Sequence, residues 1–205
     1  MWPVGTYERM VSDIKRREEP SIPITFGVLI ADYRQQKARE YVLNYITRFD
    51  EISGKYINFY LPGYIETEES RCYAGIKVRD TSYIFDEEVY IGFLDCFCRD
   101  FEIDFPYNPV LILLEYERGH FRNTRKIVIE LDEDGSEIEH TGRLIETIVE
   151  IAKAHVELDE FSMSLQRNVV RNSLLDRILE SIDNAMVSAI AKGITDTKKY
   201  KIVSK

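Results

Sequence analysis

Few residues of this chain combine a reactive side chain with a position suited to chemistry. The clearest candidates are Asp32, Tyr33 and Arg34, which follow a strand-like apolar run and precede a helical stretch. A carboxylate at such a junction, beside a helix N-terminus, can hold a metal, a ribose or a phosphate. Asp is also a common helix cap, and this alternative stays open. The three residues are therefore candidate catalytic residues or a structural turn.

A catalytic carboxylate needs a second group. Glu115 is the only other acid embedded in an apolar strand-like run, and at the same sheet edge as Asp32 it would form a metal or acid/base pair. The chain has no glycine-rich phosphate loop and no G-x-S-x-G motif. We therefore expect no cofactor, and we keep a metal- or nucleotide-dependent enzyme around Asp32 as the alternative function.

The cysteines and histidines give little support to redox or metal chemistry. Cys72, Cys96 and Cys98 form no C-x-x-C motif. On a helix, the side chains of Cys96 and Cys98 would point about 200° apart, so we expect buried structural thiols. None of the three histidines has a second histidine or a cysteine three or four residues away. We expect no metal site.

Strand-like and helical segments follow one another in an order that restricts the fold. The nearly all-apolar run from Ile24 to Ile30 is typical of a central strand covered on both faces. A β-α-β unit of this length makes its two strands parallel. The expected segments are a short helix from Thr6 to Arg17, a strand from Ile24 to Asp32, a helix from Arg34 to Ile52, a strand from Lys55 to Leu61, a helix from Asp86 to Phe101, strands from Pro109 to Glu117 and from Arg125 to Asp132, and a closing helix.

Two connections carry further predictions. Residues 64–85 are interpreted as an insertion that holds a small hairpin, and Asp86 is expected to cap the helix that follows. The segment from Arg118 to Thr124 is short enough to join two antiparallel strands. Apolar residues of the Asp86 helix, including Ile91, are expected to form one broad buried face.

This order of segments resembles the thioredoxin fold, and Pro109 lies where that superfamily places its cis-proline. The resemblance covers roughly residues 24–156. It implies an α/β fold with a β-α-β/α/β-β-α core, in which the third strand runs antiparallel to the first. Asp32 and Glu115 would then lie at opposite sheet edges. The junction that carries C-x-x-C in the superfamily reads Asp32-Tyr33-Arg34-Gln35 here, so the resemblance implies a non-redox member.

The C-terminal third contains the strongest indication of association. Between Leu158 and Gly193, apolar residues and two asparagines recur in steps of four and three, as in a coiled-coil seam. Folding back as two helices over the sheet is the alternative. The many tyrosines in the middle of the chain favour an interface or a core edge equally. The predicted interface residues are Leu165, Asn168, Asn172, Leu175, Leu179, Ile182 and Met186.

Length and charge set the outer limits. The chain has 205 residues and a net charge of −9. We expect one domain at 1–157 and a helical arm with a basic tail at 158–205. The acidic charge argues against nucleic acid, and the sequence has neither a membrane-length apolar run nor a signal-like start. The main prediction is a cytoplasmic interaction or scaffold module that binds a protein partner or forms a homo-oligomer. Enzyme activity around Asp32 stays open as the alternative.

Overall fold

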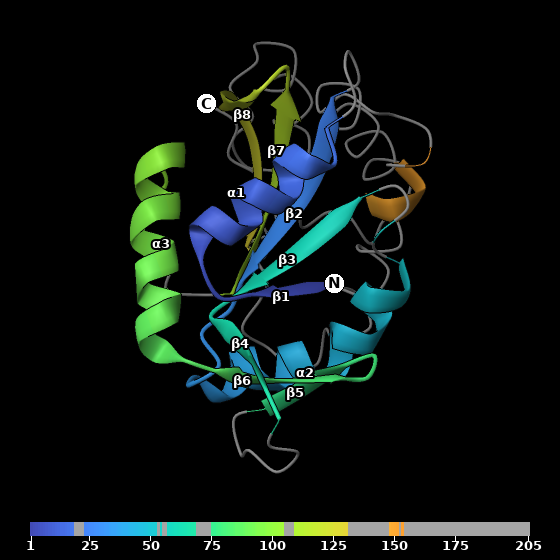
Figure 1. The fold of residues 1–205 in the computed structure, drawn as a ribbon, viewed down its shortest axis with the longest axis vertical. Helices are drawn as coiled ribbons and strands as arrows, with labels where there is room; N and C mark the ends of the chain where they lie inside the picture. Colours follow the sequence, from blue (N-terminus) through green and yellow to red (C-terminus); the bar gives the residue numbers. More distant parts are fainter. Residues whose placement is uncertain are drawn as a thin grey trace, which may run out of the picture.

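The chain folds as a mixed α/β protein in a computed structural model that describes residues 1–18, 23–52, 54, 57–68, 75–104, 109–130, 148–151 and 153 (Figure 1). Strands and helices alternate over the first 62 residues, and two groups of strands separated by one helix follow. In chain order they are β1 (Trp2–Val4), α1 (Tyr7–Arg16), β2 (Ile24–Ile30), α2 (Gln36–Ile52), β3 (Asn58–Pro62), β4 (Tyr64–Thr67), β5 (Gly75–Val78), β6 (Thr81–Phe85), α3 (Glu87–Phe101), β7 (Val110–Glu117) and β8 (His120–Glu130).

The main sheet has five strands in the order β1-β3-β2-β7-β8. β2 is parallel to β3 and antiparallel to β7, as predicted, and β7 is antiparallel to β8. β1 adds a parallel strand at the edge beside β3. The sequence analysis missed β1, because three residues that include a proline carry no strand signal.

β2 is the centre of the hydrophobic core. From Thr25 to Ile30 every residue of this strand is buried, which confirms the predicted mid-sheet position. On the face covered by α1 and α3, the Phe26 ring meets the Phe121 ring edge-on at 5.9 Å, and Phe121 meets Phe101 of α3 at 5.2 Å (Figure 1). Edge-to-face contacts of this kind add to the free energy gained by burying the rings.

α1 matches its predicted extent. The Thr6 side chain accepts from the Arg9 N–H at 3.2 Å, which caps the helix at its N-terminus. The Tyr7 ring then packs against Phe93 and Phe97 of α3, with ring centroids 5.9 and 6.3 Å apart. These contacts dock α1 on α3.

The insertion between β3 and α3 is a second sheet in the order β4-β6-β5. The predicted hairpin is present as β5 and β6, while β4 was not predicted. The chain turns from β3 into β4 at Gly63, whose φ of 85° favours glycine. A Cβ there would also lie 2.7 Å from the Cβ of Tyr90, so the turn needs glycine for space as well.

α3 begins where the sequence predicted. The Asp86 side chain accepts from the Val89 N–H at 3.0 Å and caps the helix. The apolar face is rotated from the prediction, because Tyr90 is buried whereas Ile91 keeps 38% of its surface exposed. The prediction for Ile91 was therefore wrong: the buried stripe follows residues 90, 93, 94, 97 and 101, at helical spacing.

The β7–β8 hairpin is tighter than predicted. β8 begins at His120 rather than at Arg125, and Arg118 and Gly119 alone form the turn, both with positive φ. The predicted seven-residue connection was wrong, because polar residues at the start of β8 pair with β7 across a register shift near Glu115. The first residues of β8 are polar and carry little strand signal of their own, and they form a strand because they pair with β7.

The closing helix is described only at 148–151 and 153, where Ile148, Val149 and Ile151 are buried as predicted. The predicted C-terminal arm at 158–205 lies outside the described residues. So does Asn108, and with it the peptide bond that precedes Pro109.

Gly27 is expected to be intolerant of any side chain. A Cβ at Gly27 would lie 2.5 Å from the Phe59 ring on β3 and 3.2 Å from Leu113 on β7. We expect Gly27→Ala to lower the free energy of unfolding by about 1–3 kcal/mol, because the two neighbours are themselves packed in the core. Urea denaturation followed by circular dichroism measures this change.

Gly92→Ala is the matched control. Apart from its chain neighbours and the adjacent backbone of α3, no atom lies within 4 Å of a Cβ at Gly92, in the middle of that helix. Alanine there should raise the free energy of unfolding by about 0.5–1 kcal/mol, because it is the better helix former. Equal stability of Gly27→Ala and the unsubstituted protein would show that the β2 environment is looser than described.

Candidate functional site

The predicted site residues Asp32, Tyr33 and Arg34 lie together in the turn between β2 and α2. The Asp32 carboxylate accepts from the Arg34 N–H at 3.0 Å and from the Arg34 guanidinium at 2.6 to 3.1 Å. The Gln35 N–H donates to the Asp32 carbonyl at 3.0 Å, and α2 begins one residue later. Asp32 therefore stabilises the turn that leads into the helix.

Arg34 connects this turn to α3, because it also forms an ion pair with Glu87 in the first turn of that helix. Burial alone would raise the pKa of Asp32, but hydrogen bonds from Arg34 and its charge outweigh burial and lower the pKa. The pKa of Arg34 is raised by the same carboxylate and by Glu87. Both Asp32 oxygens are thus engaged, and a metal ion would have to displace the arginine.

A cluster of aromatic rings lies beneath the turn. Tyr33 stacks on Phe85 at 5.9 Å and meets Tyr64 edge-on at 6.0 Å, while Tyr90 lies 5.3 Å from Phe85. Tyr64 is 1% exposed, and its hydroxyl has no hydrogen-bond partner within the described part of the chain. Burial raises the pKa of Tyr64 far above its usual range, with the phenols of Tyr33 and Tyr90 and the Asp32 carboxylate adding to the shift.

Tyr60, Tyr64 and Tyr90 are core residues. For these three positions the interface alternative is wrong, since a side chain with at most 2% exposure cannot reach a partner protein. The number of tyrosines in a sequence does not distinguish interface residues from core residues, because a phenol ring suits both environments.

Glu115 does not join Asp32. In the register of β2 and β7, Glu115 lies opposite Thr25 at the start of β2, whereas Asp32 follows the end of that strand. The Glu115 carboxylate is 1% exposed and pairs with Arg122 at 3.3 Å. The two acids are at opposite ends of the sheet, so they form no catalytic carboxylate pair.

Cys96 and Cys98 are half-buried free thiols on α3 rather than fully buried residues, so the sequence prediction overstated their burial. Both pack against the edge of the core. Burial raises the pKa of the Cys98 thiol to about 11, and the nearby Asp95 and Asp104 carboxylates contribute to the shift. A thiol with this pKa is a poor nucleophile at neutral pH.

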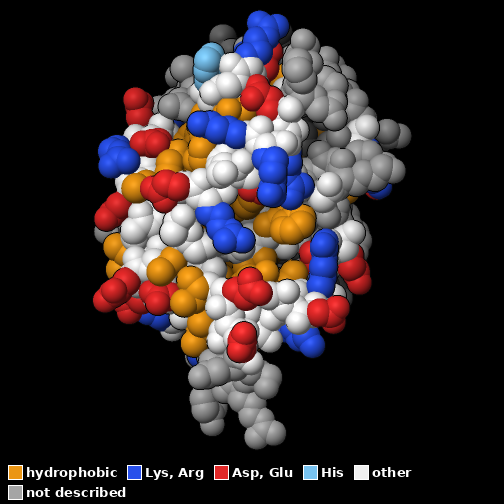
Figure 2. Space-filling view, viewed as in Figure 1, with side chains coloured by type: hydrophobic (Ala, Val, Ile, Leu, Met, Phe, Trp, Pro, Cys, Tyr) orange, Lys and Arg blue, Asp and Glu red, His pale blue; other side chains and the backbone are white. Residues whose placement is uncertain are grey.

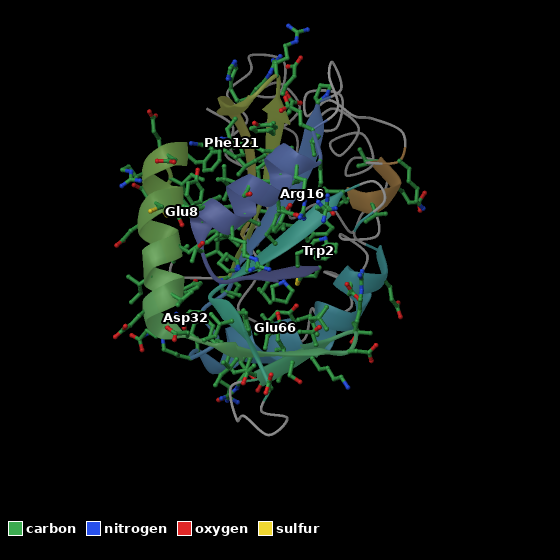
Figure 3. The ribbon with its side chains drawn as sticks, viewed as in Figure 1. Trp2, Glu8, Arg16, Asp32, Glu66 and Phe121 are labelled. Atoms are coloured by element: carbon green, nitrogen blue, oxygen red, sulfur yellow. The ribbon has the colours of Figure 1, made fainter. Side chains whose placement is uncertain are left out.

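A groove of about 650 Å³ lies between α1, β1 and β4, a volume in the range of ligand-binding clefts. Figure 3 shows Trp2 in the middle of this region, with Arg16 of α1 on one side and Glu66 of β4 on the other. In Figure 2 Lys and Arg side chains and hydrophobic side chains alternate across the same face. The groove is lined by Trp2, Pro3, Val4, Gly5, Thr6, Arg9, Ser12, Asp13, Arg16, Tyr60, Tyr64, Ile65, Glu66 and Tyr83.

Trp2 is held by three polar neighbours. Its Nε1 donates to Asn58 Oδ1 at 3.1 Å, and Arg17 donates to the same oxygen at 3.3 Å. The guanidinium groups of Arg17 and Arg79 lie 4.8 and 5.2 Å from the indole centroid. Cation–π contacts of this kind fix the ring in the groove.

Asp13 supports the wall formed by α1. Its carboxylate accepts from the Tyr60 hydroxyl at 2.7 Å and from Arg17 at 3.0 Å, and it pairs with Arg16. Although burial would raise the pKa of Asp13, the Tyr60 and arginine contacts lower it. The carboxylate therefore stays charged and ties α1 to β3.

The sequence analysis did not find this groove, whose members come from segments that are far apart in the chain. The described residues contain no group of His, Cys, Asp and Glu side chains that would hold a metal ion. Among these residues there is also no helix that is long and apolar enough to cross a membrane. Comparison with protein-family profiles, curated proteins and solved structures finds no match.

Tyr64→Phe is expected to raise the free energy of unfolding by about 1 kcal/mol, because it removes a buried hydroxyl without a partner and keeps the ring. Tyr60→Phe is the matched control. It removes a hydroxyl that is bonded to Asp13, so it should lower stability by about 1 kcal/mol. Urea denaturation measures both. If Tyr64→Phe lowered the free energy of unfolding as much as Tyr60→Phe, the Tyr64 hydroxyl would have a hydrogen-bond partner in solution.

Cys98 is expected to react slowly with iodoacetamide. At about pH 8 a thiol with a pKa of about 11 has roughly a hundredfold less thiolate than a thiol of ordinary pKa. Mass spectrometry of the Cys98 peptide, labelled in the folded protein and in urea, measures the ratio of rates. Fast labelling in the folded state would contradict the structural role assigned to this thiol.

Proposed function

We propose that this chain is a non-redox protein of thioredoxin-like fold that works by association, with its C-terminal segment joining it to a second copy or to a protein partner. The observation that carries the proposal is the main sheet together with the junction after its central strand. The main sheet has the strand directions of that fold, and the candidate catalytic residues Asp32 and Arg34 are paired with each other.

The strand order supports the thioredoxin-like assignment. From β3 through β2 and β7 to β8, the neighbours are parallel, antiparallel and antiparallel in turn. In the superfamily that the sequence resembles, the same directions accompany a β-α-β unit followed by a β-hairpin. α2 and α3 occupy the two connections in that order. Fold likeness alone carries no activity, so the function rests on the site.

The junction after β2 favours binding over catalysis. Where redox members need a thiolate, the chain has Asp32 and Arg34 locked to each other and to Glu87. Tyr33, between them, is 5% exposed and stacks in the core. A reactive carboxylate needs free oxygens as well as access. The Asp32 side chain is 16% exposed, but both of its oxygens are bonded to Arg34.

The association part of the proposal rests on sequence pattern. Leu165, Leu175, Leu179, Ile182 and Met186 recur at the spacing of a coiled-coil seam, and Asn168 and Asn172 interrupt it. Asparagine at such positions fixes register and partner number. A seam of this length, beside a sheet domain with its own buried core, favours a partner outside the domain.

The test is the absolute mass of the full chain in solution, measured by light scattering. We expect a dimer or larger assembly, and we expect Leu175→Asp combined with Leu179→Asp to dissociate it, because a charge in the seam would be buried on association. The far-ultraviolet spectrum should keep the signature of the sheet domain, because both substitutions lie in the segment 158–205.

Ser173→Asp combined with Ser181→Asp is the control. It adds the same two negative charges to the same segment at positions outside the seam, and it should leave the mass unchanged. A mass that is the same for the unsubstituted chain and both variants would refute association through this segment.

A further inference from the structure

We propose that the groove between α1, β1 and β4 binds an extended peptide segment of a partner protein, which adds as a strand to the free edge of β4 and places an acidic side chain at Arg9 and a basic side chain at Glu66. This site is separate from the C-terminal seam. It does not require self-association, so either proposal can fail alone.

The backbone of β4 is suited to strand addition. Among the residues that the structure describes, β4 is an edge strand of the smaller sheet. The Gly63 carbonyl accepts from the Asp86 N–H at 2.8 Å, at the start of the pairing between β4 and β6. Hydrogen-bonded residues alternate along an antiparallel strand, so Ile65 bonds to β6 and Glu66 directs its N–H and C=O to the free edge. An extended peptide would meet a donor and an acceptor there.

The facing strand β1 cannot receive the peptide in the same way. Its Val4 carbonyl accepts from the Gly63 N–H at 3.0 Å, so the alternation turns the Pro3 carbonyl to the outer edge. Proline has no N–H, and β1 has only three residues. β4 therefore carries the pairing, and β1 forms the opposite wall.

The groove also offers apolar surface for alternate side chains of a strand. Ile65 keeps 38% of its surface exposed and lines the groove, and Trp2 and Tyr83 are partly exposed beside it. Side chains of an extended peptide point alternately to the two sides, so every second one would rest on this surface. Covering the exposed apolar surface of Ile65 with a peptide side chain would add favourable free energy to binding.

The charges of the groove are divided into satisfied and unsatisfied groups. Arg16 and Asp13 pair with each other. Arg9 on α1 and Glu66 on β4 also line the groove, are exposed, and have no ion pair within the described residues. The open charges thus lie on opposite walls and have opposite signs. A ligand that satisfies both needs one acidic and one basic group on an apolar body, which a peptide segment provides.

This division of charge separates a peptide from other ligands. Nucleic acid would place phosphates along the whole groove and be repelled by Glu66. A small anion would use Arg9 alone and leave the β4 edge and the apolar surface unused. The peptide is the ligand class that uses the edge, the surface and both charges together.

The test is selection from a display library of heptapeptides against the full-length chain, followed by titration of the winning synthetic peptides. The chain has one tryptophan, and Trp2 lines the groove, so intrinsic fluorescence reports occupancy of this site directly. We expect enriched peptides that combine an acidic and a basic residue at fixed separation with β-branched or aromatic residues between them, and that change the Trp2 emission on binding.

Reversing the charges of Arg9 and Glu66 tests the orientation of the bound peptide. Arg9→Glu and Glu66→Lys should each weaken the selected peptide by about tenfold or more, because each sets like charges against each other. The double variant should select peptides in which the acidic and basic positions are exchanged. Lys15→Glu is the control, since it makes the same charge change on an exposed position of α1 outside the groove, and it should leave affinity unchanged.

Three results would overturn the proposal. The first is a library with no enriched sequence. The second is selected peptides that bind Arg9→Glu and Glu66→Lys as tightly as the unsubstituted chain. The third is free glutamate or phosphate changing the Trp2 emission as strongly as the peptides, which would make the groove a small-anion site. Light scattering of each variant shows whether the assembly state has changed, so a failure of the seam is distinguished from a failure of the groove.

Discussion

Strand β2 is hydrogen-bonded to a neighbour on each side and buried on both faces, and the rest of the molecule is arranged around this constraint. Its two neighbours run in opposite directions. The parallel one requires a long crossover, which α2 supplies, and the antiparallel one brings β7 back from α3. Gly27, at the centre of β2, lets Phe59 and Leu113 close over the strand from both sides.

The same directions decide which side chains can work together. Because β7 runs against β2, Glu115 is carried away from Asp32 and is neutralised by Arg122 instead. Asp32 is left with Arg34, whose guanidinium also reaches Glu87 on α3. A junction that can hold a reactive group in other proteins serves here as a clamp between the sheet and α3. Arg9 on α1 and Glu66 on β4, in contrast, have no ion pair within the described part of the chain.

The sequence predicted those elements whose own residues determine them. Ile24 to Ile30 is apolar at nearly every position, and Asp86 is followed by acidic residues and an amphipathic helix, so β2 and the start of α3 were predictable from local pattern. β1 and the first half of β8 were not. Their residues have little strand preference of their own, and they are strands because β3 and β7 offer free hydrogen-bonding groups beside them.

The groove could not be predicted either, because it too depends on contacts between segments that are far apart in the sequence. Trp2 and Asn58 are bonded across 56 residues of sequence, and Tyr60 and Asp13 across 47. The pairing of β1 with β3 brings Trp2 beside β3, so missing β1 meant missing one wall of the groove. The Asp32 turn could be recognised because its three residues are adjacent in the chain.

The net charge of the whole chain is −9, but the local charge on the face around Trp2 differs from it. Arg16 and Arg17 share the carboxylate of Asp13, while Arg79 pairs with Asp50. Burial lowers the pKa of the N-terminal amino group, which also bonds to Asp50, to about 6, so this group adds little charge at neutral pH. Cations therefore outnumber the carboxylates that hold them around Trp2. Such a local excess acts over about 8 Å at physiological ionic strength, which is the width of a groove rather than of a protein. A partner would meet this local field, so the sign of the whole chain is a weak guide to what this face can bind.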